Sequence, residues 1–112
     1  MTNIRRNEIY FASVEFSDKP IEKTRPVVVI SKNSYNSDNP DVIVCAMTTN
    51  SSHNCFVPLS QEVLSEGKFF EESGIRYDGI QKLAKVKFKQ KIGKITDEFH
   101  KKLVEKIVGL IG

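Results

Sequence analysis

Tryptophan is absent from this sequence, and cysteine is rare, because only Cys45 and Cys55 occur among its 112 residues. The two cysteines lack the CxxC spacing of redox and zinc motifs, so we expect small buried side chains rather than a disulfide framework. No apolar run reaches the roughly 20 residues of a membrane helix. The start of the chain, MTNIRRNEIY, has no apolar stretch of signal-peptide length. We therefore expect a cytoplasmic protein without a membrane partner.

Motifs for cofactors and metals are missing as well. The sequence has neither a GxGxxG segment nor a phosphate-binding GxxxxGK loop. His53 and His100 stand apart from each other, without a companion at ligand spacing, so we expect no metal and no cofactor. His100 falls on a predicted helix and is expected at the surface. His53, in a loop, is expected to be a solvated side chain or a proton carrier near neutral pH.

The net charge of +3 is too small by itself to indicate a nucleic-acid-binding protein. Its distribution is more informative. Residues 76–94 carry seven basic side chains and one acidic side chain, a local charge of +6, whereas residues 62–72 carry a local charge of −3. Charges separated in this way favour one face of the molecule that attracts a polyanion.

The length predicts a single domain over residues 1–112. Runs rich in β-branched and aromatic residues predict six strands, at 8–16, 26–31, 41–48, 55–59, 75–87 and 90–95. Pro26 lacks an N–H group and is expected only as the first residue of its strand. Pro58 indicates that its short strand lies at an edge of the sheet.

The segments between the predicted strands are polar. Residues 17–24 and 32–40 predict loops, and residues 60–73 predict an irregular acidic segment with one helical turn at Gln61–Leu64. A C-terminal helix is predicted with Thr96 as its N-cap. Its apolar side consists of Phe99, Leu103, Val104, Ile107 and Val108. The predicted fold class is mainly β with a C-terminal α-helix: a small barrel-like sheet of five to six strands with an amphipathic helix packed on it.

Two polar residues stand at the ends of the most apolar strands. Arg25 precedes PVVVIS, and Thr48 ends DVIVCAMT. If these strands are antiparallel neighbours, the two ends meet at one rim of the sheet. A guanidinium offers two parallel hydrogen bonds to a phosphate, and a threonine hydroxyl can donate to a phosphate oxygen, so the pair suits phosphoryl chemistry. The alternative is that Arg25 pairs with Glu15 or Glu22 at the surface and Thr48 only ends its strand.

Five segments in a fixed order strengthen the first interpretation: TRPVVVIS, an Asn/Ser/Asp-rich loop, VIVCAMT, YDGIQKLAKVK, and KIGKIT before a helix that ends in GLIG. In order and spacing the chain resembles the MazF/PemK toxins of bacterial and archaeal toxin–antitoxin pairs, from about residue 6 to residue 112. Members of that family commonly carry glycine at the position of Asn7. They also carry a Gly/Ser/Glu/Gln-rich segment where this chain has the short SDKPIEK.

The resemblance implies a small Src-homology-3-like barrel that works as a homodimer. It implies a sequence-selective, metal-independent endoribonuclease that cuts single-stranded RNA. In that reaction the ribose 2′-hydroxyl attacks the adjacent phosphate and leaves a 2′,3′-cyclic phosphate and a 5′-hydroxyl. The implied catalytic residues are Arg25 and Thr48. The implied substrate-binding residues are Thr49, Asn50, His53, Asp78, Gln81 and Lys82.

Partners follow from the same resemblance. A cognate antitoxin protein is expected to neutralise the toxin, and operator DNA is expected to be contacted through that antitoxin. Base selection is expected from the loops at 17–24, 49–54 and 65–74, with Tyr35, Phe69 or Phe70 as stacking side chains.

Two other functions remain open at this point. Toxins of the CcdB class, which resemble this class in fold, poison DNA gyrase through a C-terminal tail that bears tryptophan, and this chain has no tryptophan. The other is a catalytically silent regulator that binds only an antitoxin or operator DNA. Cleavage of RNA in the presence of EDTA separates the nuclease from both.

Overall fold

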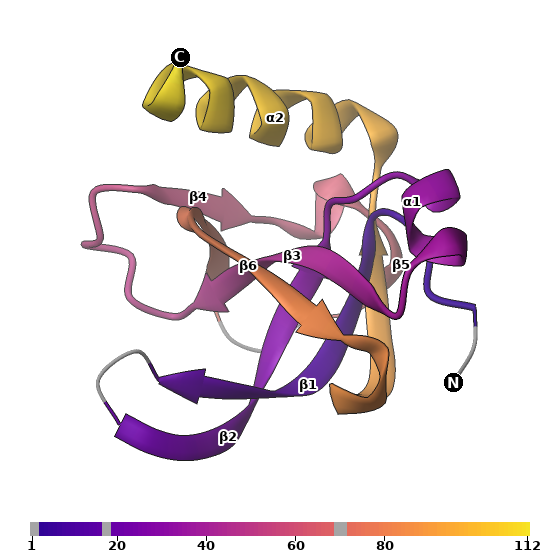
Figure 1. Cartoon of the computed structure of the whole chain (residues 1–112). Helices are drawn as coiled ribbons and strands as arrows, with labels where there is room; N and C mark the ends of the chain where they lie inside the picture. The colour runs from indigo at the N-terminus through magenta and orange to yellow at the C-terminus, as the bar shows by residue number, and fades with distance from the viewer. Residues whose placement is uncertain (1–2, 17–18, 69–71) are drawn as a thin grey trace.

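Seven strands form one antiparallel sheet in the computed structural model, which describes residues 3–16, 19–68 and 72–112. The strands are β1 (Glu8–Phe16), β2 (Lys19–Val29), β3 (Asp41–Thr48), β4 (Phe56–Leu59), β5 (Leu64–Gly67), β6 (Ser73–Ala84) and β7 (Phe88–Ile95). The helices are α1 (Asn33–Asp38) and α2 (Asp97–Ile111), with two single 3₁₀ turns, η1 (Gln61–Val63) and η2 (Lys85–Lys87). Helix α2 lies across one end of the molecule, and the β1–β2 hairpin lies at the opposite end (Figure 1).

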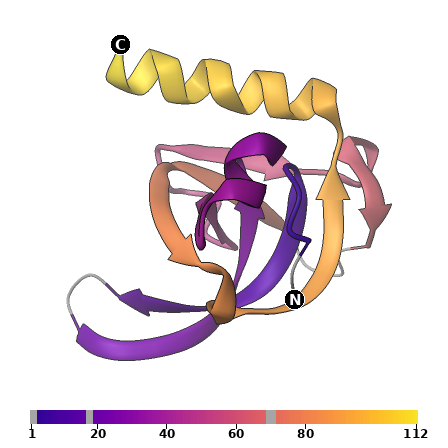
Figure 2. The same ribbon diagram turned by 45° about the vertical axis from the view of Figure 1, so that its right-hand side comes forward.

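The mainly β class with a C-terminal helix is confirmed. The strand count and the closure of the sheet differ from expectation. The order is β4-β6-β3-β2-β1-β7-β5, so seven strands are present instead of five to six, and the described edge strands β4 and β5 are not paired with each other. The sheet therefore curls around its own interior, as Figure 2 shows, without closing into a barrel.

The strand missed by the sequence analysis is β5, within the segment expected to be irregular. It has four residues, most of them exposed, so it carries no alternating pattern, and its place in the sheet comes from pairing with β7. The expected helical turn at Gln61–Leu64 is present as η1. Residues 32–40, expected to be a loop, contain α1, which buried polar bonds fix to the sheet: Asn36 Nδ2 donates to the Ser31 carbonyl at 2.9 Å, and the Ile43 N–H donates to Ser31 Oγ at 3.0 Å.

The prediction of a loop at residues 17–24 is wrong for most of that segment. Strand β2 begins at Lys19 and pairs with β1 from there onward, whereas residues 17 and 18 lie outside the described residues. The exposed side chains of residues 21–25 give the strand no apolar face by which the sequence could reveal it. Pro26 consequently lies inside β2 and not at its start. It is tolerated because β2 pairs with β3 only over Val27–Val29, so at Pro26 one side of the strand has no ladder to complete.

Alternating side chains divide the sheet between two apolar clusters. The first cluster fills the curl: Ile4, Tyr10, Ala12, Val14, Val27, Val29, Val42, Val44, Leu83 and Phe88. The second cluster lies on the other face: Ile9, Val28, Cys45, Met47, Val57, Ile75, Ile95, Phe99 and Leu103. Cys45 and Cys55 are free thiols, and burial raises the pKa of the Cys45 thiol to about 12. Helix α2 covers the second cluster, because two of its residues belong to that cluster.

The predicted N-cap of α2 is confirmed, since Thr96 Oγ1 accepts from the Phe99 N–H at 3.2 Å. Phe99 and Leu103 are buried as predicted, but Val104 and Val108 are exposed by 39% and 55%, because one narrow stripe of the helix meets the sheet. The prediction that His100 lies at the surface is wrong. It is 9% exposed, and burial, followed by the nearby Arg6 cation, lowers the pKa of its imidazole. Among the described residues, no helix is long and apolar enough to span a membrane.

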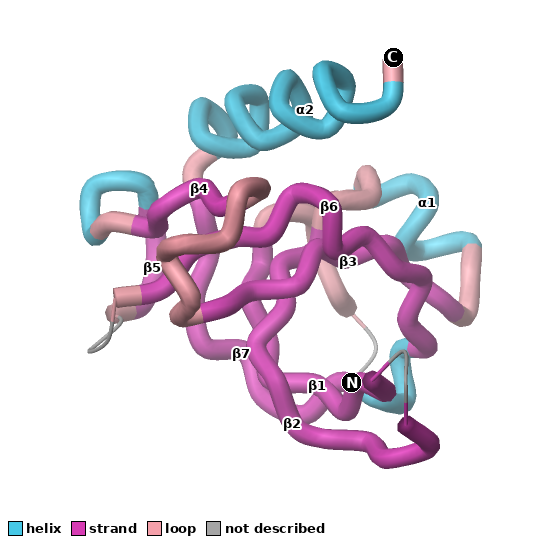
Figure 3. The backbone as a smooth tube through the Cα atoms, turned by 90° about the vertical axis from the view of Figure 1, so that its left-hand side faces the viewer, coloured by secondary structure: helices cyan, strands magenta, loops and turns pink. Residues whose placement is uncertain are grey.

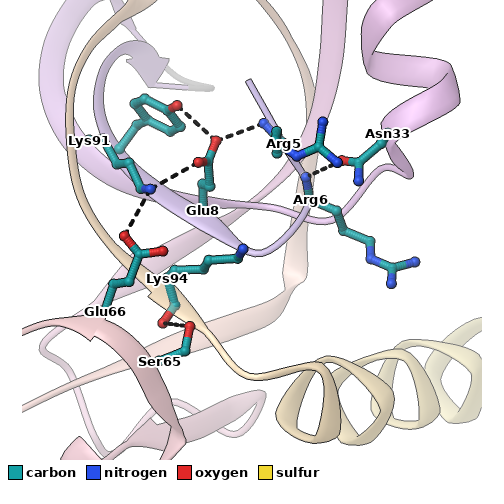
Figure 4. A network of polar contacts seen from close by, with 9 residues as sticks. Arg5, Arg6, Glu8, Asn33, Ser65, Glu66, Lys91 and Lys94 are labelled. Atoms are coloured by element: carbon teal, nitrogen blue, oxygen red, sulfur yellow. Dashed lines mark hydrogen bonds and ion pairs between the residues drawn. The ribbon is translucent and has the colours of Figure 1, made fainter. Parts of the chain in front are cut away.

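A polar network joins three strands around Glu8 (Figure 4). The Arg5 N–H at 2.7 Å and the Tyr10 hydroxyl at 2.9 Å both donate to Glu8 Oε1. Lys91 contacts Glu8 at 3.0 Å and Glu66 at 3.0 Å. Burial by itself would raise the pKa of Glu8, but the bonds from Arg5, Lys91 and Tyr10 lower it overall. The network therefore fixes β5 to the end of the sheet where β1 meets β7.

Asn7 has a backbone φ of 78°, in the left-handed region that glycine and asparagine adopt most readily. Its N–H donates to the Val29 carbonyl at 2.8 Å, and its carbonyl accepts from the Ile95 N–H at 2.9 Å. The turn therefore requires one of these residue types, which agrees with the glycine common at this position in the family that the chain resembles.

Two glycines are expected to respond in opposite directions to replacement by alanine. A Cβ at Gly109, in α2, would meet no heavy atom within 4 Å. Gly109→Ala should therefore raise the free energy of unfolding by about 0.5–1 kcal/mol, because alanine loses less backbone entropy in a helix. A Cβ at Gly74 would collide with the Phe56 ring and lie 2.5 Å from the Val57 carbonyl oxygen, so Gly74→Ala should destabilise. Urea unfolding of both variants measures the difference, and a loss of stability in Gly109→Ala would contradict it.

Candidate active site

The register between β2 and β3 brings Arg25 and Thr48 to one side of the sheet. The two strands are antiparallel, and their pairing ends at Val27 and Ala46. Arg25 and Thr48 each lie two residues beyond that last pair, so both side chains project on the face of Val27 and Ala46. Both residues line the same pocket. Thr48 therefore ends its strand at a cavity that Arg25 also lines.

The pocket has a volume of about 940 Å³ and is formed by β1, β2, β3 and β6. Figure 3 shows β3 and β6 side by side, with β1 and β2 at the end of the molecule away from α2. The described residues that line the pocket are Val14, Glu15, Arg25, Pro26, Val27, Ala46, Met47, Thr48, Thr49, Ser73, Arg76, Asp78, Gly79, Ile80 and Gln81. Among the described residues, the lining thus combines apolar walls with two guanidinium groups, two carboxylates and several hydroxyl or amide groups.

An irregularity in β6 shapes one wall of this pocket. Cys45 pairs with Ile80 and Met47 with Ile75, so residues 76–79 of β6 face the single residue Ala46 of β3. A bulge of this kind redirects side chains away from the regular alternation. It lets both Arg76 and Asp78, as well as Gly79, line the pocket. Gly79 packs closely on β3, since a Cβ there would lie 3.0 Å from that of Ala46.

Arg76 and Asp78 form a two-pronged ion pair within the lining. Arg76 Nε donates to Asp78 Oδ1 at 3.2 Å, and one terminal nitrogen donates to Oδ2 at 3.2 Å. The bond from Arg76 lowers the pKa of the Asp78 carboxyl, burial opposes this, and the charges of Arg76 and His53 lower it further. Asp78 is therefore anionic at neutral pH, and its orientation is fixed by Arg76.

Local hydrogen bonds give the loop after β3 a fixed shape. Thr48 Oγ1 accepts from the Asn50 N–H at 3.1 Å, Asn50 Oδ1 accepts from the Ser52 N–H at 3.2 Å, and His53 Nδ1 accepts from the Cys55 N–H at 3.1 Å. In each case a side chain accepts from the backbone two residues further on, a common turn motif. Thr48 Oγ1 already accepts a hydrogen bond from the Asn50 N–H, and the hydroxyl hydrogen can still be donated to an oxygen in the pocket.

The residues expected to bind substrate divide into three groups. Thr49, Asp78 and Gln81 line the pocket with the two expected catalytic residues. Asn50 and His53 lie in the adjoining loop and do not line it. Lys82 lies on the opposite face from its neighbour Gln81, because successive strand residues alternate, and it contacts Asp41 at 3.7 Å.

Of the expected stacking side chains, Tyr35 lines a separate pocket beside α1 and His100. Phe69 and Phe70 lie outside the described residues. Within the described residues, no three His, Cys, Asp or Glu side chains gather closely enough to hold a metal ion.

Three polar residues of the described lining were not identified as site residues from the sequence: Glu15, Ser73 and Arg76. Arg76 was visible only as one member of a basic stretch, and the bulge that turns it into the pocket has no sequence signature. Glu15 follows the buried Val14 on β1, and this alternation predicts only an ordinary strand residue that faces solvent. Ser73 Oγ is buried without a hydrogen-bond partner, a property that only the structure reveals.

Known proteins share this sequence pattern and this fold. Residues 5–111 match the family model described as "PemK-like, MazF-like toxin of type II toxin-antitoxin system". An endoribonuclease from mycobacterial species, solved in complex with its cognate antitoxin, is 18% identical, with 97% of this chain and 95% of that chain covered and a TM-score of 0.78.

Two further solved structures are similar over most of their length. The Mycobacterium tuberculosis toxin MazF-mt6 is 22% identical, with 91% and 93% of the two chains covered and a TM-score of 0.70. A MazE-MazF crystal structure from Deinococcus radiodurans is 13% identical, with 98% and 97% covered and a TM-score of 0.78. A search of curated proteins found no match. At these identities the solved structures establish a shared fold.

The Arg76–Asp78 pair can be tested directly by NMR titration of the Asp78 carboxyl. Because Arg76 is the largest cause that lowers this pKa, Arg76→Gln should raise it toward the ordinary value for aspartate. In the unmodified protein the ion pair is present at neutral pH and is lost as pH falls through the lowered pKa. His53→Gln should raise the pKa by less, since its charge is a smaller cause. An Asp78 pKa unchanged by Arg76→Gln would mean that the pair does not form.

Proposed function

We propose that this chain, which belongs to the PemK-like, MazF-like toxin family of type II toxin–antitoxin systems, is an endoribonuclease that cleaves single-stranded RNA. The observation that carries the proposal is the meeting of Arg25 and Thr48 in one pocket, at the open end of the β2–β3 pairing. These two side chains provide a permanent planar cation and a hydroxyl donor, the groups that a scissile phosphate requires.

In the proposed reaction the ribose 2′-oxygen attacks the adjacent phosphorus, and the bond from phosphorus to the 5′-oxygen breaks. The products are a 2′,3′-cyclic phosphate and a 5′-hydroxyl. Arg25 stabilises the charge that develops on the non-bridging oxygens, because its forked donors match two of them. Thr48 donates to the phosphate or holds the nucleophile in line, from a hydroxyl oriented by the Asn50 N–H.

Single-stranded RNA is the proposed substrate because its unpaired bases can turn out of the helix and enter a pocket. Thr49 and Gln81, which line the pocket, are suited to hydrogen-bond base edges. Pro26 and Ile80 offer apolar surface to the sugar and base. Arg76, although paired with Asp78, adds a second cation that attracts the polyanion.

Regulation by a cognate antitoxin forms part of the proposal. The matched family consists of toxins of toxin–antitoxin systems, and one similar structure holds its cognate antitoxin. An acidic antitoxin segment would compete with RNA for the two guanidinium groups of the pocket. Contact with operator DNA would occur through that antitoxin, and the site of action is the cytoplasm, where the RNA is.

Cleavage of a long RNA in EDTA tests the nuclease directly. The protein should release discrete fragments with 5′-hydroxyl ends. Arg25→Ala and Thr48→Ala should each lower the rate by about 10²–10³-fold, the cost of removing one donor to a developing oxyanion. Thr48→Ser keeps the hydroxyl and should retain most of the activity, whereas Arg25→Lys keeps the charge but loses the fork.

Lys101→Ala is the matched control for the loss of a cation, because Lys101 is exposed on α2, outside the pocket. It should leave the rate unchanged, and circular dichroism should be the same for all variants. Intact RNA with the unmodified protein would reject the nuclease. Inhibition of gyrase would then favour the gyrase-poisoning class, and antitoxin or operator binding alone would favour the silent regulator.

We also propose a homodimer, since α2 exposes apolar side chains that a partner subunit would cover: Val104, Val108, Leu110 and Ile111. Light scattering at micromolar concentration should give a mass of about twice 12.7 kDa. Val108→Asp should shift the mass toward the monomer, because it buries a charge in the interface. A monomer under all conditions would remove the dimer from this account.

A further inference from the structure

A separate pocket, called here the α1 pocket, lies beside α1 and extends to His100 of α2. Its volume is about 610 Å³, and none of its described lining residues belongs to the described lining of the pocket that holds Arg25 and Thr48. Sites for small molecules typically have volumes of about 300–1,000 Å³. The side chains of the α1 pocket therefore indicate which small molecule it suits.

Two cations line the pocket near the start of α1. The Arg6 N–H donates to Asn33 Oδ1 at 2.8 Å, which fixes this part of the chain beside the helix (Figure 4). A terminal nitrogen of Arg6 lies 3.8 Å from Asp97 Oδ1, too far for a hydrogen bond, so the guanidinium can direct its N–H groups to a ligand. Lys32, an exposed residue, directly precedes α1. A guanidinium with an ammonium nearby suits a phosphate group.

His100 adds an imidazole to the same lining. It is 9% exposed, and its Nδ1 is buried without a hydrogen-bond partner among the described residues. Buried polar atoms in folded proteins are nearly always bonded, so the site favours a ligand that hydrogen-bonds to this ring. Burial and then the charge of Arg6 lower the pKa of the imidazole, while the charge of Asp97 opposes them. The ring is therefore neutral at neutral pH and offers a hydrogen-bonding group instead of a third positive charge.

The other end of α1 contributes groups of a different kind. Six helical residues span about 9 Å, and Asp38 and Asn39, at the far end from Lys32, also line the pocket. Asn39 Nδ2 donates to the Tyr35 carbonyl at 2.9 Å, which leaves the amide oxygen to accept. The Asp38 carboxylate repels a second anion but accepts hydrogen bonds from hydroxyl or amino groups. An acidic peptide or an inorganic anion therefore fits only one end of the pocket.

The middle of the lining is aromatic and apolar. Tyr35 is half-buried, and Ile30 and Ile43 stand with it in the pocket. An aromatic ring of this kind stacks on a nucleobase of any type. A ligand with a phosphate at one end, hydroxyl or amino groups at the other and a flat ring between them matches all three parts of the lining. A nucleotide has this arrangement.

We propose that the α1 pocket binds a nucleoside 5′-monophosphate. Its phosphate accepts hydrogen bonds from Arg6 and is attracted by Lys32, its base packs on Tyr35, and Asp38 accepts from its hydroxyl or amino groups. This role does not depend on the proposed nuclease function. The nucleotide is either a free molecule or the phosphorylated 5′ end of an RNA, and the chemistry of recognition is the same for both.

The test uses the full-length protein and AMP as the probe. Isothermal titration calorimetry should give a dissociation constant between about 1 µM and 1 mM, the usual range for small metabolites. In NMR spectra the ring signals of His100 should shift on addition of AMP, whereas those of His53, the other histidine of the chain, should stay in place. His53 lies in the loop beside the pocket of Arg25 and Thr48, so its signals report a nucleotide that binds there instead.

Three variants test the cationic end. Arg6→Gln should weaken AMP binding by about tenfold or more, because it removes hydrogen bonds to a charged group. Lys32→Gln should weaken it by about two- to fivefold, because an exposed ion pair contributes less. Arg5→Gln is the matched control, since Arg5 is exposed, lies outside the described lining and keeps its backbone bond to Glu8. It should leave the dissociation constant unchanged, and all three variants should unfold at the temperature of the unmodified protein.

Other probes separate the parts of the ligand and its source. Adenosine, which lacks the phosphate, should bind at least about tenfold more weakly than AMP. Ribose 5-phosphate, which lacks the base, should bind about fivefold or more weakly. A 2′-O-methyl oligonucleotide, which has no free 2′-hydroxyl to react, is compared with and without a 5′-phosphate. Arg6-dependent binding of the phosphorylated form assigns the pocket to an RNA end, and binding of AMP alone assigns it to a free nucleotide.

Four results overturn the proposal. The first is AMP that produces neither heat nor a shift of the His100 signals at millimolar concentration. The second is an AMP affinity that Arg6→Gln leaves unchanged. The third is adenosine that binds as tightly as AMP, which would remove the phosphate from the interaction. The fourth is a shift of His53 in place of His100, which would put the nucleotide in the pocket of Arg25 and Thr48.

Discussion

The antiparallel register of β2 against β3 is the constraint on which the rest of the site depends. Pairing over Val27–Val29 sets which side chains of the two strands share a face, and it ends where the strands begin to enclose the pocket. A shift by one residue would send Arg25 to the other face and leave Thr48 alone. Both sides of this pairing are packed against apolar clusters, so such a shift would expose a core of valines to water and is strongly disfavoured.

The strands behind the site and the hydrogen bonds around it hold the side chains of the pocket in fixed orientations. Val27 and Ala46 hold the backbone, the N–H of Asn50 orients the Thr48 hydroxyl, and Arg76 is oriented by its pair with Asp78. Side chains fixed before the substrate arrives lose little freedom when it binds. The fold thus presents a preorganised set of hydrogen-bond donors along the pocket that Arg25 and Thr48 line.

Sequence patterns predicted the elements in which burial is regular. The continuous apolar run at 41–48 predicted the bounds of β3 correctly, and Thr96 as the N-cap predicted where α2 begins. Elements whose side chains are mostly exposed escaped prediction, as β5 and the polar half of β2 did, because they carry no apolar pattern. In the site, Arg25 and Thr48 could be singled out because they interrupt apolar strands. Arg76 and Glu15 could not, since a bulge and a strand end, rather than any local pattern, direct them to the pocket.

The most direct test is a crystal structure of the protein with an RNA oligonucleotide that spans a mapped cleavage site and carries one 2′-deoxy sugar there, which prevents cleavage. The account predicts that the scissile phosphate lies within hydrogen-bond distance of both the Arg25 guanidinium and Thr48 Oγ1. A phosphate bound at any other surface, with the pocket between β2, β3 and β6 left without RNA, would contradict it.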